Sequence, residues 1–206
     1  MTLPSYQVPA KECQIEQEVK RSKFLSFAAP AVSRKEAEDF IRTLRKQHPH
    51  ANHVCWAYIA GAPNTTIRSM SDDGEPSGTA GMPMLKVLEY SGYGDIVVVV
   101  VRYFGGTKLG TGGLQRAYSD AVALVLTDLP MKLKVARATL LLTYDYTHDG
   151  NISRLLERYD VQDIKPNYAQ QVTLSIAIAR SELSTFKTEL TNITAGNVVC
   201  SLPGTD

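Results

Sequence analysis

The sequence predicts an α+β protein with two domains, an N-terminal α/β sandwich and a C-terminal ferredoxin-like domain of element order βαββαβ. Its 206 residues suffice for one large domain or two small ones. The β-branched run at residues 96–101 is typical of a strand buried on both faces. The pattern of strands and helices changes at Pro130, so we place the domains at residues 1–130 and 131–206.

The first domain is expected to start with an irregular stretch, residues 1–10. A hairpin follows, because two strand-like runs flank the basic turn Lys20–Lys23. Ser33 and Glu36 form a capping box that starts a helix, and Pro49 ends that helix. Further strands are expected at Val54–Ala60, Ile67–Ser71 and Ile96–Val101, and helices at Thr79–Tyr90 and from Leu114 to about Asp128.

The second domain alternates strand-like and helix-like runs of apolar residues. This half contains no nucleophile motif, metal-ligand cluster or glycine-rich loop, so we look for function in the first half. The expected elements are a strand at Val135–Tyr144, a helix at Asn151–Tyr159, strands at Val161–Tyr168 and Gln171–Ala179, a helix at Ser181–Leu190 and a strand at Asn197–Leu202.

Composition excludes several classes of function. The 22 basic and 21 acidic residues nearly cancel, which argues against nonspecific coating of DNA. The three cysteines are far apart and have no metal or redox spacing. The chain shows neither a signal-peptide pattern nor an apolar run of the roughly 18 residues that a membrane span needs. We therefore expect a cytoplasmic protein with no membrane partner.

A glycine-rich loop after the central strand is the leading candidate site. Five glycines fall between Gly105 and Gly113, before a helix-like pattern. A helix N-terminus offers unpaired N–H groups and a partial positive charge, and Lys108 and Arg116 add cations. The alternative is that the glycines only allow a tight turn and close packing. On either interpretation we expect Gly112→Val to damage the fold or the loop.

A second loop, residues 71–81, carries three carboxylates within four positions, Asp72, Asp73 and Glu75. Such a group can hold Mg²⁺, can pair with Arg102 or its neighbouring cations, or can be a solvated turn. We favour an ordered, charge-paired loop, and therefore expect no metal and no cofactor. Histidines 48, 50 and 53 are not expected to bind metal either, because a proline breaks the helix that would align them.

Three segments resemble the YigZ/IMPACT family. They are KRSKF at Lys20–Phe24, SDDGEPSGTAGMPML at Ser71–Leu85 and VVVVRYFGGTKLGTGGLQRAY at Val98–Tyr118. The first differs slightly, because Lys23 stands where arginine is more usual in the family. The resemblance covers Cys13 to about Leu129, and the rest of the chain is similar to the smaller C-terminal domain of bacterial members.

The resemblance implies that the first domain has the fold of the second domain of a small-subunit ribosomal protein. The second domain would resemble the fifth domain of elongation factor G. Eukaryotic members act in translational control under amino-acid starvation, by competing for a partner of a stress kinase, and carry a different extra domain. For bacterial members, RNA or ribosome binding is inferred from fold analogy.

We therefore predict a nucleic-acid- or ribosome-binding protein linked to regulation of translation, in which the glycine loop and nearby cations contact phosphate. The alternatives are a protein–protein adaptor in translational stress control, and an enzyme acting on a phosphorylated small molecule through the acidic loop. An enzyme is the least favoured, and no catalytic residue is assigned. The predicted nucleic-acid- or anion-binding residues are Lys20, Arg21, Lys23, Arg102, Tyr103, Gly105, Gly106, Lys108, Gly110, Gly112, Gly113 and Arg116.

Overall fold

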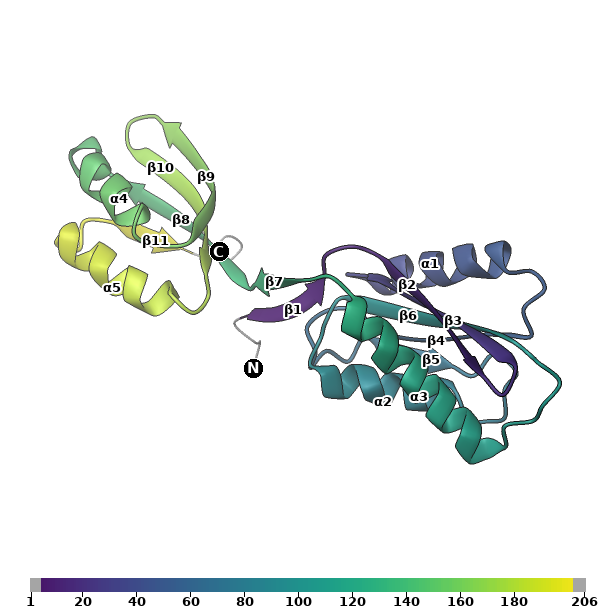
Figure 1. Cartoon of the computed structure of the whole chain (residues 1–206). Coiled ribbons are helices and arrows are strands. Elements are labelled where there is room, and N and C mark those ends of the chain that lie inside the picture. The colour runs from purple at the N-terminus through teal and green to yellow at the C-terminus, as the bar shows by residue number, and fades with distance from the viewer. Residues whose placement is uncertain (1–4, 202–206) are drawn as a thin grey trace. The chain divides into compact units, whose positions relative to one another are not determined.

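The computed structural model describes residues 5–201, which form two compact units (Figure 1). Residues 6–134 make up most of the first unit, and the second begins at Val135. Both units combine helices and strands, so the predicted α+β class with two domains is confirmed. The predicted division after Pro130 lies close to the change of unit and stays a prediction.

The first unit is built on a five-stranded sheet in which every pair of neighbouring strands is antiparallel. Helices α2 and α3 cover one face and α1 covers the other (Figure 1). In spatial order the strands are β2 (Cys13–Val19), β3 (Ser22–Pro30), β6 (Ile96–Tyr103), β4 (His53–Ile59) and β5 (Arg68–Ser71). The helices are α1 (Arg34–Gln47), α2 (Gly81–Ser91) and α3 (Thr111–Asp128).

The central strand β6 is buried on both faces, as the apolar run predicts. Residues 96, 98 and 100 pack against α2 and α3, whereas residues 97, 99 and 101 pack on the side of α1. The same alternation continues to the end of the strand. It directs Arg102 to the α2/α3 face, where it stacks on Phe24, and Tyr103 to the α1 face, where it contacts His48.

Local signals explain where the helices begin. The capping box at α1 is confirmed, because Glu36 N–H donates to Ser33 Oγ at 3.2 Å. The Glu36 carboxylate in turn accepts from the N–H of Val32 at 3.0 Å. Helix α2 begins at Gly81 and not at Thr79, and α3 begins at Thr111, so that two of the loop glycines lie in its first turn.

Two strands were missed. Strand β1 (Ser5–Pro9) pairs with β7 (Met131–Val135), so the expectation of an irregular N-terminal stretch is wrong for residues 5–9. Asp95, which is only 2% exposed and precedes β6, connects β1 and β7 to the five-stranded sheet. Its Oδ2 accepts from Tyr6 Oη at 3.3 Å and from Lys134 Nζ at 2.5 Å. Because β1 and β7 are far apart in the chain, local periodicity does not reveal that they pair.

The second unit has the predicted βαββαβ order, and its four strands lie in the order β11-β8-β10-β9. Helices α4 and α5 pack on one face of this sheet (Figure 1). The elements are β8 (Arg137–Tyr144), a short 3₁₀ helix η1 (Tyr146–His148), α4 (Asp149–Leu156), β9 (Val161–Tyr168), β10 (Val172–Ala179), α5 (Leu183–Ile193) and β11 (Val199–Ser201). The predicted last strand extends to Leu202, which lies outside the described residues.

Between residues 5 and 201, no helix combines the length and the apolarity that crossing a bilayer requires.

Replacing the cap of α1 tests the local account of this helix. Ser33→Ala removes the acceptor for the N–H of Glu36, and we expect it to lower the free energy of unfolding by about 1 kcal/mol. Ser33→Asp keeps an acceptor and should stay within a few tenths of a kcal/mol of the parent. Chemical denaturation measures both, and equal losses would contradict the capping role.

Candidate functional site

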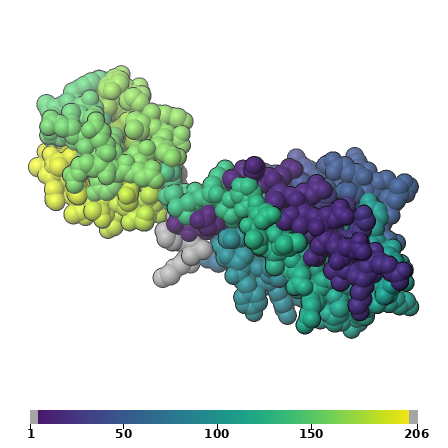
Figure 2. Space-filling view, viewed as in Figure 1, coloured from purple at the N-terminus to yellow at the C-terminus, as the bar shows by residue number. Residues whose placement is uncertain are grey.

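The carboxyl end of β6 brings the basic turn and the glycine loop into contact. Lys20 and Arg21 form the two-residue turn between β2 and β3, with φ of 48° and 65°. Arg21 Nη2 donates to Thr107 Oγ1 at 3.0 Å. A Cβ on Gly105 would lie 1.9 Å from the carbonyl oxygen of Arg21, so this position requires glycine. The β2–β3 hairpin and α3 lie side by side on the surface of this unit (Figure 2).

A buried ion pair joins the acidic loop to β6. Arg102 is 5% exposed and Glu75 is 8% exposed. Arg102 Nη1 donates to Glu75 Oε1 at 2.6 Å, and Tyr118 Oη donates to the same oxygen at 2.8 Å. The guanidinium also lies over the rings of Phe24 and Phe104, at 5.5 and 5.6 Å from their centroids. The predicted charge pairing of the acidic loop with Arg102 is therefore confirmed.

The other two carboxylates of the acidic loop have separate structural partners. Asp72 accepts from the N–H groups of Gly78, Ala80 and Gly81 at 2.8 to 2.9 Å, just where α2 begins. Burial by itself raises the pKa of Asp72, but these three hydrogen bonds outweigh it and leave the pKa below its ordinary value. They stabilise the carboxylate form and the first turn of α2 together.

Asp73 belongs to a third set of contacts. Its Oδ1 accepts from Arg45 Nη2 at 2.6 Å and its Oδ2 accepts from the N–H of Val54 at 2.7 Å. The three carboxylates thus bind different partners and do not converge on one point. Across the described part of the chain, histidines, cysteines and carboxylates form no cluster suited to a metal ion.

Titratable groups beside the ion pair are poorly suited to nucleophilic catalysis. The Cys55 thiol donates to the carbonyl of Asp72 at 2.9 Å and lies 3.3 Å from Tyr118 Oη. Burial raises the pKa of Cys55 and of Tyr118 far above neutrality, so both stay protonated. His53 Nδ1 lies 2.9 Å from the carbonyl oxygen of Asp73, and its Nε2 lies 3.8 Å from Glu75 Oε2. Neither the thiol nor the phenol is therefore an activated nucleophile.

Sequence reasoning missed the side chains that hold the loops. Ser22 Oγ accepts from Arg102 Nη2 at 3.3 Å and from the N–H of Gly105 at 3.2 Å. Asn52 Oδ1 accepts from the N–H of Phe104 at 2.8 Å. These residues flank β6 only because β3 and β4 are its sheet neighbours. They cannot be identified from the sequence until the strand order is known.

A cavity of about 380 Å³ lies between the acidic loop and the glycine loop. One wall is the start of α3, whose N-cap Gly110 has φ of 76° and receives no side-chain cap from the described residues. The cavity combines opposite charges with apolar surface. Its lining residues are Glu75, Pro76, Arg102, Phe104, Lys108, Leu109, Gly110, Thr111 and Leu114.

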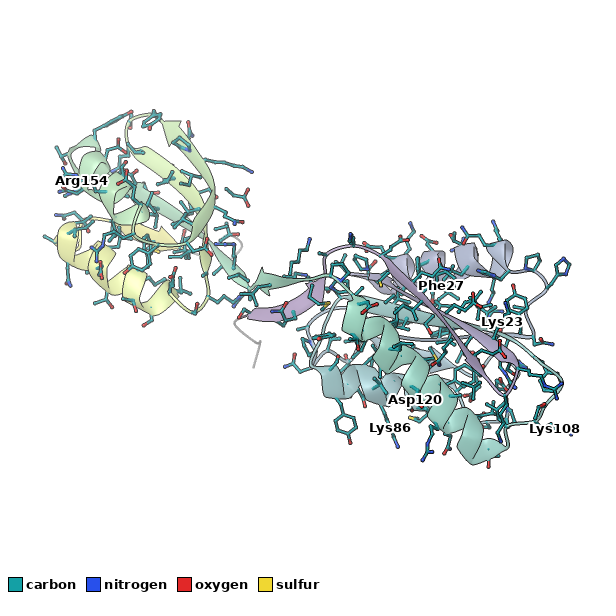
Figure 3. The ribbon with its side chains drawn as sticks, viewed as in Figure 1. Lys23, Phe27, Lys86, Lys108, Asp120 and Arg154 are labelled. Atoms are coloured by element: carbon teal, nitrogen blue, oxygen red, sulfur yellow. The ribbon has the colours of Figure 1, made fainter. Side chains whose placement is uncertain are left out.

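The predicted site residues do not all meet there. Lys20, Arg21, Lys108 and Arg116 are exposed, and Figure 3 shows Lys108 on the loop that leads to α3. Lys23 instead pairs with Glu16 at 3.3 Å. Tyr103 Oη lies 2.9 Å from His48 Nδ1, on the α1 face, away from the cavity that Arg102 lines.

The glycines of the loop differ in what the fold requires of them. Gly106 has φ of 85°, which favours glycine as at Gly110. Gly113 is close to Leu109, whose Cβ would lie 3.2 Å from an added Cβ. Gly112 has an ordinary φ, and no described atom would lie within 4 Å of a Cβ there. The expectation that Gly112 needs positive φ or close packing is therefore wrong, because this residue lies in a regular, open helical turn.

Both compact units match known families. Residues 20–126 match the Impact N-terminal domain, and residues 142–197 match a domain of unknown function (DUF1949). An IMPACT family member of Haemophilus influenzae is 37% identical over 97% of this chain and 98% of its own length. The IMPACT family member YigZ of Escherichia coli is 36% identical over 95% and 97%. A crystal structure of a hypothetical protein, 35% identical, aligns with a TM-score of 0.71 over 99% of this chain and 100% of that chain.

Breaking the buried ion pair should strongly destabilise the first unit. Glu75→Leu leaves the Arg102 guanidinium buried without its counter-charge, and we expect it to lower the free energy of unfolding by about 3 kcal/mol. Adding Arg102→Met removes that charge and should recover part of the loss. Urea unfolding of the two single variants and the double variant measures the coupling, and strictly additive losses would contradict it.

The Asp72 cap should depend on pH. Asp72→Asn removes the negative charge, and we expect a loss of about 1 kcal/mol in the free energy of unfolding at pH 7. Because the pKa of Asp72 is lower in the folded state, this stabilisation is present above the ordinary aspartate value of about 3.9 and is lost as the pH falls through the folded value.

The difference between the parent and Asp72→Asn should therefore narrow below about pH 4. Asp120→Asn, on the exposed surface of α3, is the control and should match the parent throughout (Figure 3). Unfolding curves between pH 3 and 8 provide the measurement. A difference for Asp72→Asn that stays constant over this range would contradict the role of the charge.

Proposed function

Since the chain belongs to the IMPACT family, we propose that it binds RNA, free or within the ribosome, and that this binding is linked to regulation of translation. The observation that carries the proposal is the direct contact between the basic turn and the glycine loop, through Arg21 and Thr107. This contact joins two segments that are far apart in the sequence into one surface. RNA backbones are recognised by such local groupings of cations and backbone N–H groups.

Phosphate contacts are assigned to the exposed cations of this surface. Lys20 and Arg21 lie in the turn that contacts the glycine loop, Lys108 lies within that loop, and the partial positive charge at the start of α3 adds to them. Arg102 differs, because Glu75 neutralises much of its charge within the fold. A local patch of this kind is compatible with a net charge of only +1.

Base contacts are assigned to Phe104. Its side chain is 46% exposed beside the glycine loop, although aromatic residues are usually buried. One face of the ring is supported by the Arg102 guanidinium, and an exposed ring of this kind can stack on a base. Tyr103, also among the predicted binding residues, instead contacts His48 on the opposite face of the sheet.

A salt titration with matched variants tests the proposal. We expect the full-length protein to bind a single-stranded RNA oligonucleotide with an affinity that falls as salt rises. The double variant Lys20→Ala, Lys108→Ala should bind more weakly and reduce the slope of log K against log salt by about 1.4, or 0.7 for each lost phosphate contact. Fluorescence anisotropy at several salt concentrations measures both quantities.

Two further variants sharpen this test. Arg116→Ala should weaken binding and leave the melting temperature nearly unchanged, because the side chain is exposed on α3. Lys86→Ala, on α2 and well separated from Lys108 in Figure 3, is the control and should bind like the parent. No RNA binding at low salt, or equal losses in all variants, would overturn the proposal and favour a protein–protein adaptor.

A further inference from the structure

The cavity beside the glycine loop has the size of a small-molecule site. Its volume of about 380 Å³ lies near the lower end of the roughly 300 to 1,000 Å³ typical of such sites. A hollow of this size accommodates one small molecule or one unit of a polymer. The exposed cations described above can contact an RNA backbone without involving the cavity. The cavity therefore requires a separate explanation.

One end of the cavity is suited to an anion. The first turn of α3 presents N–H groups that lack intrahelical partners, and Gly110 provides no side chain to cap them. Lys108 lines the same space. Arg102 lines it as well, and its Nε is buried without a hydrogen-bond partner among residues 5–201. A buried N–H is rarely left unpaired, so this donor supports the assignment of an acceptor near Arg102.

Another part of the cavity lining is suited to a flat ring. Phe104 and Pro76 belong to it, and the Arg102 guanidinium lies 5.6 Å from the centroid of the Phe104 ring. Phe104 nevertheless remains nearly half exposed. An aromatic side chain held in place beside an anion site can stack on any nucleobase.

We propose that this cavity binds one nucleoside monophosphate unit. Its phosphate lies at the start of α3 beside Lys108, and its base lies against Phe104 and Pro76. The proposal rests on the proposed function, since it refines the same surface. The unit has two sources, a free mononucleotide or the phosphorylated end of an RNA strand.

Calorimetric titration of the full-length protein with AMP and with adenosine tests the site itself. We expect AMP to bind and adenosine to bind at least about tenfold more weakly, because it lacks the charged group. Lys108→Ala should lower the affinity for AMP about tenfold without lowering the melting temperature, because Lys108 lines the cavity and its side chain is exposed. Phe104→Leu should lower the affinity similarly, whereas Phe104→Trp keeps a ring and should retain it. Lys46→Ala, exposed on α1, is the control.

Short RNAs with a 5′-phosphate, a 3′-phosphate or hydroxyl ends then distinguish the sources. A tenfold gain in affinity from one terminal phosphate, lost in Lys108→Ala, assigns the site to a strand end. AMP binding without such a gain assigns it to a free nucleotide. No AMP binding and no gain, or equal binding of AMP and adenosine, overturns the inference. RNA binding that depends on Lys20 and on salt would still support the proposed function in that case, and AMP binding without RNA binding would remove that function alone.

Discussion

The buried pair of Arg102 and Glu75 is the interaction on which the rest of the first unit depends. Two charges inside a protein are tolerated only when they compensate each other and their remaining polar atoms find partners. Here Tyr118 from α3 and Ser22 from β3 provide two of those contacts. The pair therefore connects the central strand, a neighbouring strand, the acidic loop and the long helix. Residues of the central strand, the acidic loop and the long helix line the cavity together with the glycine loop.

This constraint separates structural charges from available ones. The acidic loop appears in the sequence as a cluster of carboxylates, yet each carboxylate is committed to a different partner inside the fold. The cations of the basic turn and of the glycine loop remain on the surface. Because the acidic charges are satisfied internally, they compete little with phosphate for Lys20 and Lys108. A nearly neutral protein can therefore present a basic surface locally.

Burial limits the chemistry of the nucleophilic groups around the ion pair. The Cys55 thiol and the Tyr118 phenol lie 3.3 Å apart there, and burial keeps both protonated. The cavity lining combines cations, the Glu75 carboxylate and apolar surface. In the complex proposed above, this lining would orient an anionic ligand by its charged group and hold the remainder by stacking and burial.

The sequence by itself determined the elements that local pattern encodes. The apolar run of β6, the capping box of α1 and the βαββαβ order of the second unit all follow from periodicity and cap chemistry, and the glycines identified the loop. Only the tertiary structure decided that β1 pairs with β7, that Tyr103 contacts His48, and which carboxylate meets which cation. Periodicity gives the face of a residue within its own element, whereas partners across the sheet depend on strand order, which long-range packing sets.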